Sequence, residues 1–262
     1  MMEERAGRFS DRVALVLGGT EGIGREIVRS LVKEGAQVAV GARTKAKLEE
    51  LEAELGAACI GVPTDVASEE DVEAAVAAAV SRFGRIDLAF NVAGKSRPGT
   101  IVDLTEENFQ TALDISLKGT MFGMKHAARQ MIRQGAGGAI VNVSSVNSFM
   151  PAYGGGAYAS SKAAVDMLTK NAALELARHK IRVNALLPGL TETAMTKRMR
   201  DNAELLREFE ERIAMQRAAD PAEIAAPALF LASDEASYVT GIAMIADGGW
   251  ALTGYPDLSK FF

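Results

Sequence analysis

The sequence has little of several residue types and patterns, and each shortage excludes a class of protein. Its single cysteine, Cys59, excludes an internal disulfide and is typical of a reducing compartment, so we expect a cytoplasmic protein. The two histidines, His126 and His179, do not cluster with other ligand types, so we expect no metal site. No basic run stands out and the formal net charge is −5, which disfavours nucleic acid as a partner. No apolar run approaches the roughly 18 residues of a membrane span, and the charged first residues are unlike a signal peptide, so we expect no membrane partner.

Short apolar runs alternate with segments of helical spacing along most of the 262 residues. The runs predict strands at 12–18, 37–42, 58–62, 86–92, 139–144 and 181–187. The helical segments are 23–33, 45–55, 68–82, 105–133 (one long helix or two) and 158–178. This alternation predicts an α/β fold, a doubly wound parallel sheet with helices on both faces. We expect one domain over 1–262, with a helical insertion at about 190–216 over one end of the sheet.

The stretch 140–162 carries the most suggestive chemistry. Tyr158 and Lys162 are four residues apart, so on a helix they share one face. An ammonium beside a phenol favours the phenolate, so we expect a lowered pKa for Tyr158 and a usable proton donor and acceptor. Ser145, at the end of an expected strand, is placed to meet the same oxygen. Taken alone, the spacing also fits two surface residues one turn apart.

The first strand–helix turn, 17–24, reads Leu-Gly-Gly-Thr-Glu-Gly-Ile-Gly. This is Gly-x-x-x-Gly-x-Gly rather than Gly-x-Gly-x-x-Gly, but it stands where that fingerprint would be. Glycines permit a tight turn and close backbone approach, and the helix N-terminus that follows suits a pyrophosphate.

Five motifs occur in an order and spacing that resemble the classical short-chain dehydrogenase/reductase family. They are the glycine turn, Asn91-Val92-Ala93-Gly94, Ser145, Tyr158-x-x-x-Lys162 and Pro188-Gly189. The resemblance covers about 9–250 and implies a Rossmann-like domain with a seven-stranded sheet, which is usually a homotetramer. It implies that a nicotinamide cofactor delivers hydride to a carbonyl carbon, with Tyr158 supplying the proton and Ser145 a hydrogen bond. Lys162 would also hold the nicotinamide ribose. The cofactor contacts that we expect are Gly18, Thr20, Glu21, Gly22, Ile23, Gly24, Arg43, Asp65, Val66, Asn91, Ala93, Gly94, Tyr158, Lys162, Pro188, Gly189, Thr191 and Thr193. Asn91 fits a simple turn after a strand as well.

One position departs from the family pattern. An asparagine is usual in the long helix, where this sequence has Ser116. In the family that asparagine is thought to hold a water joining the lysine to a proton relay. Serine donates and accepts hydrogen bonds, so Ser116 either keeps the water or only fills a kink in the helix.

The end of the second strand bears on coenzyme choice. Folds that select NAD place an acidic residue there to bond the ribose hydroxyls, but this sequence has Ala42 followed by Arg43, which suits a 2′-phosphate. Lys45 and Lys47 add positive charge, while Glu21 opposes a phosphate unless it turns to solvent or pairs with Arg43. We expect NADP(H) to be favoured over NAD(H) by a modest margin.

The substrate leaves few marks in the sequence. By the resemblance, 95–98, 145–153 and 190–215 would line its cleft, with Lys95, Asn147 and Tyr153 as polar candidates. Lys95 fits a solvated loop cation equally well. Met150, Met195 and Met199 suggest an adaptable apolar wall or ordinary core. Phe261 and Phe262, at the end of the tail, are aromatics that could dock on something.

Three functions remain open on the sequence alone. The first is a reductase or dehydrogenase of a small-molecule ketone and secondary alcohol, with 3-oxoacyl thioester reduction included. The second is a nicotinamide-binding sensor or scaffold without turnover, which the intact Ser145, Tyr158 and Lys162 disfavour. The third is epimerisation or enoyl reduction on the same fold. Enoyl reductases usually space their tyrosine and lysine more widely, so this spacing disfavours the third.

Overall fold

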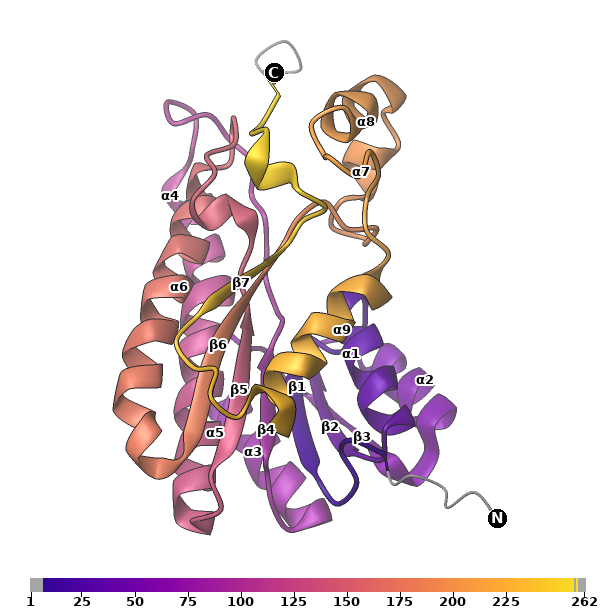
Figure 1. The fold of residues 1–262 in the computed structure, drawn as a ribbon, viewed down its shortest axis with the longest axis vertical. Helices are drawn as coiled ribbons and strands as arrows, with labels where there is room; N and C mark the ends of the chain where they lie inside the picture. The colour runs from indigo at the N-terminus through magenta and orange to yellow at the C-terminus, as the bar shows by residue number, and fades with distance from the viewer. Residues whose placement is uncertain (1–6, 257, 259–262) are drawn as a thin grey trace.

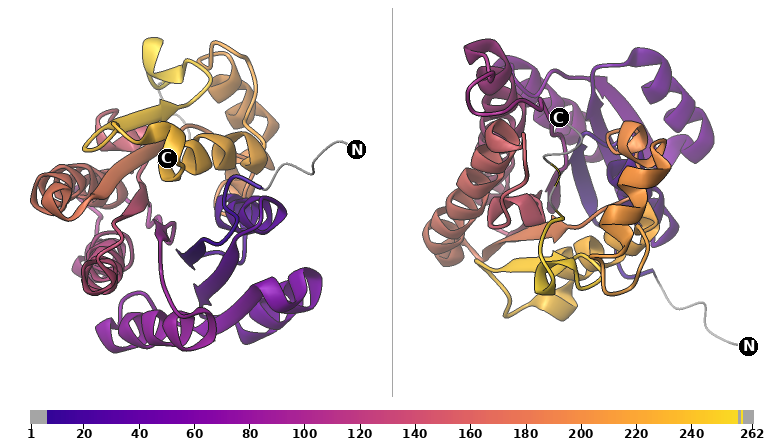
Figure 2. Two further views of the ribbon diagram at one scale, coloured as in Figure 1. Left: turned by 60° about the horizontal axis from the view of Figure 1, so that its bottom comes forward. Right: turned by 90° about the horizontal axis from the view of Figure 1, so that it is seen from above.

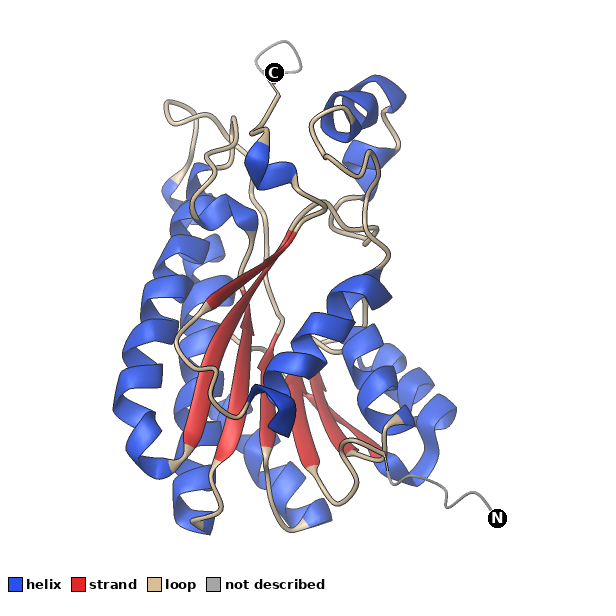
Figure 3. Cartoon of the chain, in the orientation of Figure 1, coloured by secondary structure: helices blue, strands red, loops and turns tan. Residues whose placement is uncertain are grey.

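Seven parallel strands form one sheet at the centre of the computed structural model, which describes residues 7–256 and 258 (Figures 1 and 3). The strand order is β3-β2-β1-β4-β5-β6-β7, so the chain winds outward in both directions from β1 and β4. The strands are β1 (Val13–Leu17), β2 (Gln37–Ala42), β3 (Cys59–Pro63), β4 (Leu88–Asn91), β5 (Gly138–Val143), β6 (Ile181–Pro188) and β7 (Ala243–Ala246). Parallel pairing requires crossover connections, and these are the helices. The predicted α/β class and seven-stranded sheet are confirmed.

Helices cover both faces of the sheet, as the two further views show (Figure 2). One face packs against α1 (Gly22–Lys33), α2 (Lys45–Leu55) and α9 (Pro221–Ala232). The other packs against α3 (Glu69–Phe83), α5 (Gly119–Gln134) and α6 (Gly156–Leu176). Burial on both faces explains why the strands read as continuous apolar runs rather than alternating ones. The observed bounds of β2 and α2 coincide with the predicted ones.

Local signals set the ends of several helices. Ser68 caps α3 by accepting a hydrogen bond from the backbone nitrogen of Asp71, at 3.2 Å, as its side chain predicts. Gly84 ends the helix in the left-handed conformation, with φ of 85°. Asp220 and Glu223 form a reciprocal capping box at the start of α9.

The long helical segment after β4 is continuous but not uniform. It comprises α4 (Glu106–Ala112), a π-helical turn (Leu113–Lys118) and α5. The sequence left open whether this segment forms one helix or two, and the structure shows one continuous helical segment with a wider π-helical turn in the middle. Such π-turns occur frequently at functional sites, and this one contains Ser116 at its inner side, fully buried.

The segment 190–216 lies beyond the carboxyl end of the sheet, where Figure 1 shows α7 and α8. The expected helical pattern is only partly observed, because α7 (Lys197–Arg200) and α8 (Ala203–Glu210) are short and loops flank them. Asn202 begins α8 by accepting hydrogen bonds from two backbone nitrogens, each at 3.1 Å. Phe261 and Phe262 lie outside the described residues. Within the described residues no helix combines the length and apolar character needed to span a membrane.

Candidate active site

A cavity of about 590 Å³ opens at the carboxyl edge of the sheet. Segments that directly follow β1 to β6 line it, because parallel strands bring these ends to one edge. Most of the residues singled out from the sequence lie in its wall: Gly18, Thr20, Glu21, Gly22, Ile23, Gly24, Arg43, Asp65, Val66, Ala93, Gly94, Lys95, Ser145, Asn147, Tyr153, Tyr158, Lys162, Pro188, Gly189, Thr191 and Thr193. Asn91 and Ser116 do not line it.

The glycine turn between β1 and α1 is shaped so that side chains are excluded. Gly18 has φ of 90°, and a Cβ there would stand 2.7 Å from the backbone nitrogen of Ala93. A Cβ on Gly24 would stand 2.1 Å from the carbonyl oxygen of Gly18. Glu21 is the N-cap of α1, yet its side chain caps no backbone N–H, and the first turn contains no acidic residue. The turn thus presents a bare helix N-terminus to the cavity, which suits a bound anion.

Near the end of β2, the Glu21 side chain adopts neither of the two arrangements that the sequence suggested. The Glu21 carboxylate pairs with Lys47, neither turning to solvent alone nor pairing with Arg43. Lys45 pairs with Glu49 at 3.5 Å, so its charge is also offset. The exposed Arg43 guanidinium lines the cavity, and within the described residues it makes no ion pair. One uncompensated positive charge therefore stands beside the cavity at this point.

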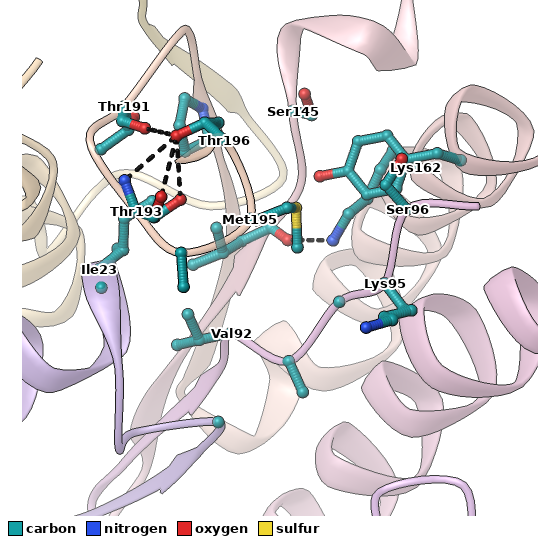
Figure 4. Close-up of a pocket in the computed structure, with 18 of the residues that line it drawn as sticks. Ile23, Val92, Lys95, Ser96, Ser145, Lys162, Thr191, Thr193, Met195 and Thr196 are labelled. Atoms are coloured by element: carbon teal, nitrogen blue, oxygen red, sulfur yellow. Dashed lines mark hydrogen bonds between the residues drawn. The ribbon is translucent and has the colours of Figure 1, made fainter. Parts of the chain in front are cut away.

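Ser145, Tyr158 and Lys162 meet where β5 ends and α6 begins. The Ser145 hydroxyl accepts a hydrogen bond from the backbone nitrogen of Asn147 at 3.2 Å and is hydrogen-bonded to the Tyr158 phenol. Lys162 is 2% exposed, and its Nζ donates to the carbonyl oxygen of Val143 at 2.7 Å (Figure 4). The same Nζ lies 5.5 Å from the centroid of the Tyr158 ring. The helical spacing thus does bring tyrosine and lysine together on the cavity side.

The expected effect of Lys162 on Tyr158 is wrong for this structure. Burial raises the pKa of Tyr158 to about 12, and only the hydrogen bond from Ser145 opposes it. Burial also lowers the pKa of Lys162 to about 8, with Asp166 acting in the opposite direction. Desolvation penalises both charged forms, and the ammonium is directed to a backbone carbonyl rather than to the phenol oxygen. Desolvation therefore outweighs the attraction that the four-residue spacing suggested.

Ser116 lies behind the cavity wall. Its hydroxyl accepts a hydrogen bond from the backbone nitrogen of Lys95 at 3.3 Å. A Cβ placed on Gly94 would be 3.3 Å from the Nζ of Lys162 and 3.7 Å from the Oγ of Ser116. The backbone of Gly94 is therefore close to both the Lys162 ammonium and the Ser116 hydroxyl, and Ser116 occupies the π-turn.

Asn91 is turned away from the cavity. Its amide nitrogen donates to the Oδ1 of Asn142 at 2.8 Å, and Asn142 donates in turn to Thr169 at 2.8 Å. A Cβ on Gly123 would stand 1.9 Å from the Oδ1 of Asn91, so α5 packs directly on this amide. The Asn91 side chain thus fixes β4 to β5 and the helices behind them, and only the backbone that follows it reaches the cavity.

A loop after β6 closes the opposite wall. The Thr196 hydroxyl donates to the carbonyl oxygens of Thr191 at 2.6 Å and Thr193 at 3.2 Å (Figure 4). The side chain of Thr193 comes close to the glycine turn, since a Cβ on Gly22 would be 2.8 Å from its Cγ2. Sequence reasoning named Thr191 and Thr193 but missed Thr196, whose three-residue spacing from Thr193 is the only signal for this loop.

The expected substrate segments meet at the far end of the cavity, beside Ser145. Lys95, Asn147 and Tyr153 line it, as do Met195 and Met199, whereas Met150 belongs to a neighbouring apolar core. Sequence reasoning missed an aromatic group there, consisting of Phe209, Trp250 and Tyr255. No spacing pattern connects these three, because α8 and the C-terminal segment meet only in the folded chain.

No group of three or more histidine, cysteine, aspartate or glutamate side chains within the described residues is arranged to hold a metal ion. The polar groups in the cavity wall include the hydroxyls of Ser145 and Tyr158, the ammonium of Lys162 and the backbone of the glycine turn.

Comparison with known proteins gives consistent matches over nearly the whole chain. A family model described as enoyl-(acyl carrier protein) reductase matches residues 18–251. The chain is 39% identical over 251 residues to the short chain dehydrogenase/reductase astE of Aspergillus oryzae, covering 92% of this chain and 95% of that protein. It is 39% identical over 244 residues to a 2,5-dichloro-2,5-cyclohexadiene-1,4-diol dehydrogenase of Sphingobium indicum, covering 92% and 98%.

A solved short-chain type dehydrogenase/reductase from Mycobacterium ulcerans superposes with a TM-score of 0.92 at 37% identity, covering 97% of this chain and 94% of that one. Agreement of this extent in both sequence and structure shows that the chain belongs to the short-chain dehydrogenase/reductase family, as an oxidoreductase that acts on CH–OH and C=O groups.

Proposed function

We propose that this enzyme interconverts a ketone and a secondary alcohol, with Tyr158 as the acid and base. The observation that carries the proposal is the hydrogen-bonded pair of Ser145 and Tyr158 beside the buried Lys162, in the same cavity as the glycine turn. Family membership implies NAD(P) as coenzyme, and the cavity fits it, since a side-chain-free turn and an uncapped helix N-terminus suit its diphosphate.

By family resemblance the rest of the coenzyme would follow the cavity wall. Asp65 and Val66 would contact its adenine, and Lys162 its nicotinamide ribose. Ala93, Gly94, Pro188, Gly189, Thr191 and Thr193 would line the nicotinamide end. When bound, the nicotinamide supplies the hydride chemistry.

The chain's own groups manage the substrate oxygen and its proton. The Ser145 hydroxyl has one hydrogen, which it donates to the Tyr158 phenol in this structure and would donate to a substrate oxygen when one is bound. Tyr158, with its pKa raised to about 12, is protonated at neutral pH and is a ready donor to a carbonyl oxygen that gains negative charge. In the oxidation direction the phenol must first lose that proton.

Enoyl reduction is the second candidate, because the matched family model carries that description. Two observations favour the carbonyl reaction. Ser145 and Tyr158 converge on one point, which suits a single substrate oxygen. The similar Sphingobium protein is named for oxidation of a diol. A catalytically silent sensor would have no need for two hydroxyls bonded to each other beside a buried lysine.

A panel of ketones, secondary alcohols, 3-oxoacyl thioesters and enoyl thioesters, followed by nicotinamide absorbance, separates these functions. We expect turnover of ketones and alcohols, and Tyr158→Phe should lower kcat by several powers of ten while coenzyme binding persists. Near-normal turnover by Tyr158→Phe, or turnover of enoyl thioesters alone, would contradict the proposal.

We propose a modest preference for NADP(H) over NAD(H). Ala42 leaves no carboxylate at the end of β2, and Arg43 places an unpaired guanidinium beside the cavity. The Lys47–Glu21 pair offsets the repulsion that Glu21 would exert on a 2′-phosphate. Arg43→Ala should lower the NADPH/NADH ratio of kcat/KM, and Glu21→Ser, which frees Lys47, should raise it. A wild-type preference for NADH, or an unchanged ratio in Arg43→Ala, would refute this reasoning.

We also propose that the protein is a homotetramer of the cytoplasm. Large apolar side chains are exposed on α6, with Met167 at 58% and Leu174 at 81%, and Ile245 is 47% exposed on the edge strand β7. Exposed apolar surface on two separate elements fits two interfaces per subunit, as a tetramer of D₂ symmetry requires. The buried Cys59, whose pKa burial raises to about 12, is consistent with a reducing compartment.

A further inference from the structure

Tyr255 enters the substrate end of the cavity from the C-terminal segment, which lies beyond the residues matched by the family model. Its ring packs against Trp250, with centroids 4.4 Å apart, and against Phe209 of α8 edge to face, at 5.9 Å. The Trp250 indole nitrogen donates to the carbonyl oxygen of Gly254 at 3.2 Å, which holds the backbone just before Tyr255. The position of the phenol is therefore fixed by packing on several sides.

The Tyr255 hydroxyl donates a hydrogen bond to the Oδ1 of Asn147. Asn147 lies in the short 3₁₀ turn Val146–Ser148, and its backbone nitrogen is the donor to Ser145. One capped turn therefore connects the Tyr255–Asn147 pair to the reacting hydroxyls. The nearby Tyr158 contributes to raising the pKa of Tyr255, so the two phenols stand close enough to interact.

The surroundings of this pair are apolar. Val146, Met199, Leu205, Phe209 and Trp250 line the same end of the cavity. The Tyr255–Asn147 pair is thus a polar point with apolar side chains and flat aromatic surfaces on one side of it. Such surroundings favour an uncharged, compact ring over a charged or strongly hydrated substrate.

The hydrogen-bonding capacity of the pair matches a hydroxyl group. The Tyr255 oxygen has already donated its hydrogen and keeps acceptor capacity, whereas the Asn147 amide nitrogen, for which no bond occurs among the described residues, keeps its donors. A hydroxyl can donate to the first and accept from the second, while a carbonyl oxygen can use only the second. We propose that Tyr255 and Asn147 form a second oxygen-binding point, so that the preferred substrates are ring alcohols with a second hydroxyl away from the reacting carbon.

This inference builds on the proposed alcohol–ketone reaction, and its test uses a ratio that a merely structural role would not change. The ratio compares kcat/KM for cyclohexane-1,3-diol and cyclohexane-1,4-diol with that for cyclohexanol. We expect the wild type to favour at least one diol by about tenfold, the effect of one well-placed hydrogen-bonded pair. Tyr255→Phe keeps the ring but removes the hydroxyl, so it should bring the ratio close to one, and Asn147→Ala should do the same.

The matched control is Tyr238→Phe, which makes the same change at a fully exposed tyrosine and should leave the ratio as in the wild type. Equal loss of activity on all three alcohols in Tyr255→Phe would show that its hydroxyl only supports the fold, and would overturn the inference. A wild type without diol preference would also overturn it.

A binding measurement separates failure of this inference from failure of the proposed reaction. Trp250 is the only tryptophan in the sequence and packs on Tyr255, so its fluorescence reports on this end of the cavity. In the presence of oxidised coenzyme, a diol should change the fluorescence at about tenfold lower concentration than cyclohexanol, and Tyr255→Phe should remove that difference. If no alcohol is oxidised but this difference is found, the proposed reaction fails and the second binding point stands. Equal binding of diol and cyclohexanol would overturn the binding point, whatever the turnover.

Discussion

The charge of the buried Lys162 lowers the stability of the folded protein, whereas the charges of most ionisable groups in folded proteins do not. Lys162 is 2% exposed, and burial lowers its pKa from 10.5 to about 8. A shift of this size corresponds to about 3 kcal/mol of cost for holding the ammonium in the folded state. We therefore expect Lys162→Met, which removes the charge and keeps most of the volume, to abolish activity without loss of stability at pH 7, as when a buried charge gives way to an apolar group.

The pH dependence isolates this cost from the other effects of the substitution. Between about pH 8 and pH 10.5 the unfolded lysine keeps its proton while the folded one has released it, so wild-type stability rises with pH in that window. From pH 7 to pH 10 the wild type should therefore gain about 2–3 kcal/mol relative to Lys162→Met. Lys162→Met also loses the hydrogen bond to Val143 and changes the packing. Both effects change the stability difference between the two proteins by the same amount at every pH, so neither alters its dependence on pH.

Urea unfolding followed by circular dichroism, at equal protein concentration and at each pH, measures this difference. Lys170→Met is a suitable control, because it removes an exposed lysine from the same helix and should show no such slope. A difference between wild type and Lys162→Met that stays level from pH 7 to pH 10 would mean that water reaches the ammonium, and would refute the reasoning.

Three further predictions concern turnover and assembly. If Ser116 holds a water next to Lys162, Ser116→Ala should slow turnover and shift the pH profile, whereas Ser116→Asn should stay active; wild-type kinetics for the alanine variant at every pH would leave serine as a filler of the π-turn. Because Tyr158 must ionise before it can accept a proton and its pKa is raised to about 12, alcohol oxidation should accelerate from pH 7 to pH 9 while ketone reduction does not; stopped-flow hydride transfer that is flat in both directions would contradict this. Light scattering at micromolar concentration should give the mass of a tetramer, and a monomer mass would exclude the proposed assembly.

Much of the fold could be predicted because short-range patterns determine it. The run 37–42 is apolar and flanked by turn residues, so β2 has the predicted bounds. Helix α9 shows no such pattern in its sequence, since nearly all of its residues are apolar and Pro227 lies within it, so no helix was predicted there. The π-turn around Ser116 was also not predicted, because a change from i+4 to i+5 bonding has no simple residue signature.

The positions of site residues could be predicted better than their environments. Tyr158 and Lys162 share a face because helical geometry requires it, yet their pKa values depend on how much chain covers them. Asn91 follows the same logic, since its place after β4 was clear but the direction of its amide depends on α5, more than 25 residues later. Tyr255 reaches the cavity only through contacts with α8, and no local pattern connects these two segments.

Burial, rather than the mutual attraction of tyrosine and lysine, is the largest cause of the pKa shifts of Tyr158 and Lys162. It raises the pKa of Tyr158 and lowers that of Lys162, so each group is shifted toward its neutral form. In the proposed reaction a neutral phenol is the form that gives a proton to a carbonyl oxygen, so these pKa shifts favour reduction over oxidation at neutral pH. Oxidation requires the phenolate of Tyr158. In this structure the phenolate is favoured by the hydrogen bond that Ser145 donates to the phenol oxygen. In the proposed mechanism Ser145 would therefore have a separate task in each direction: it would stabilise the substrate oxygen during reduction and the tyrosine oxygen before oxidation.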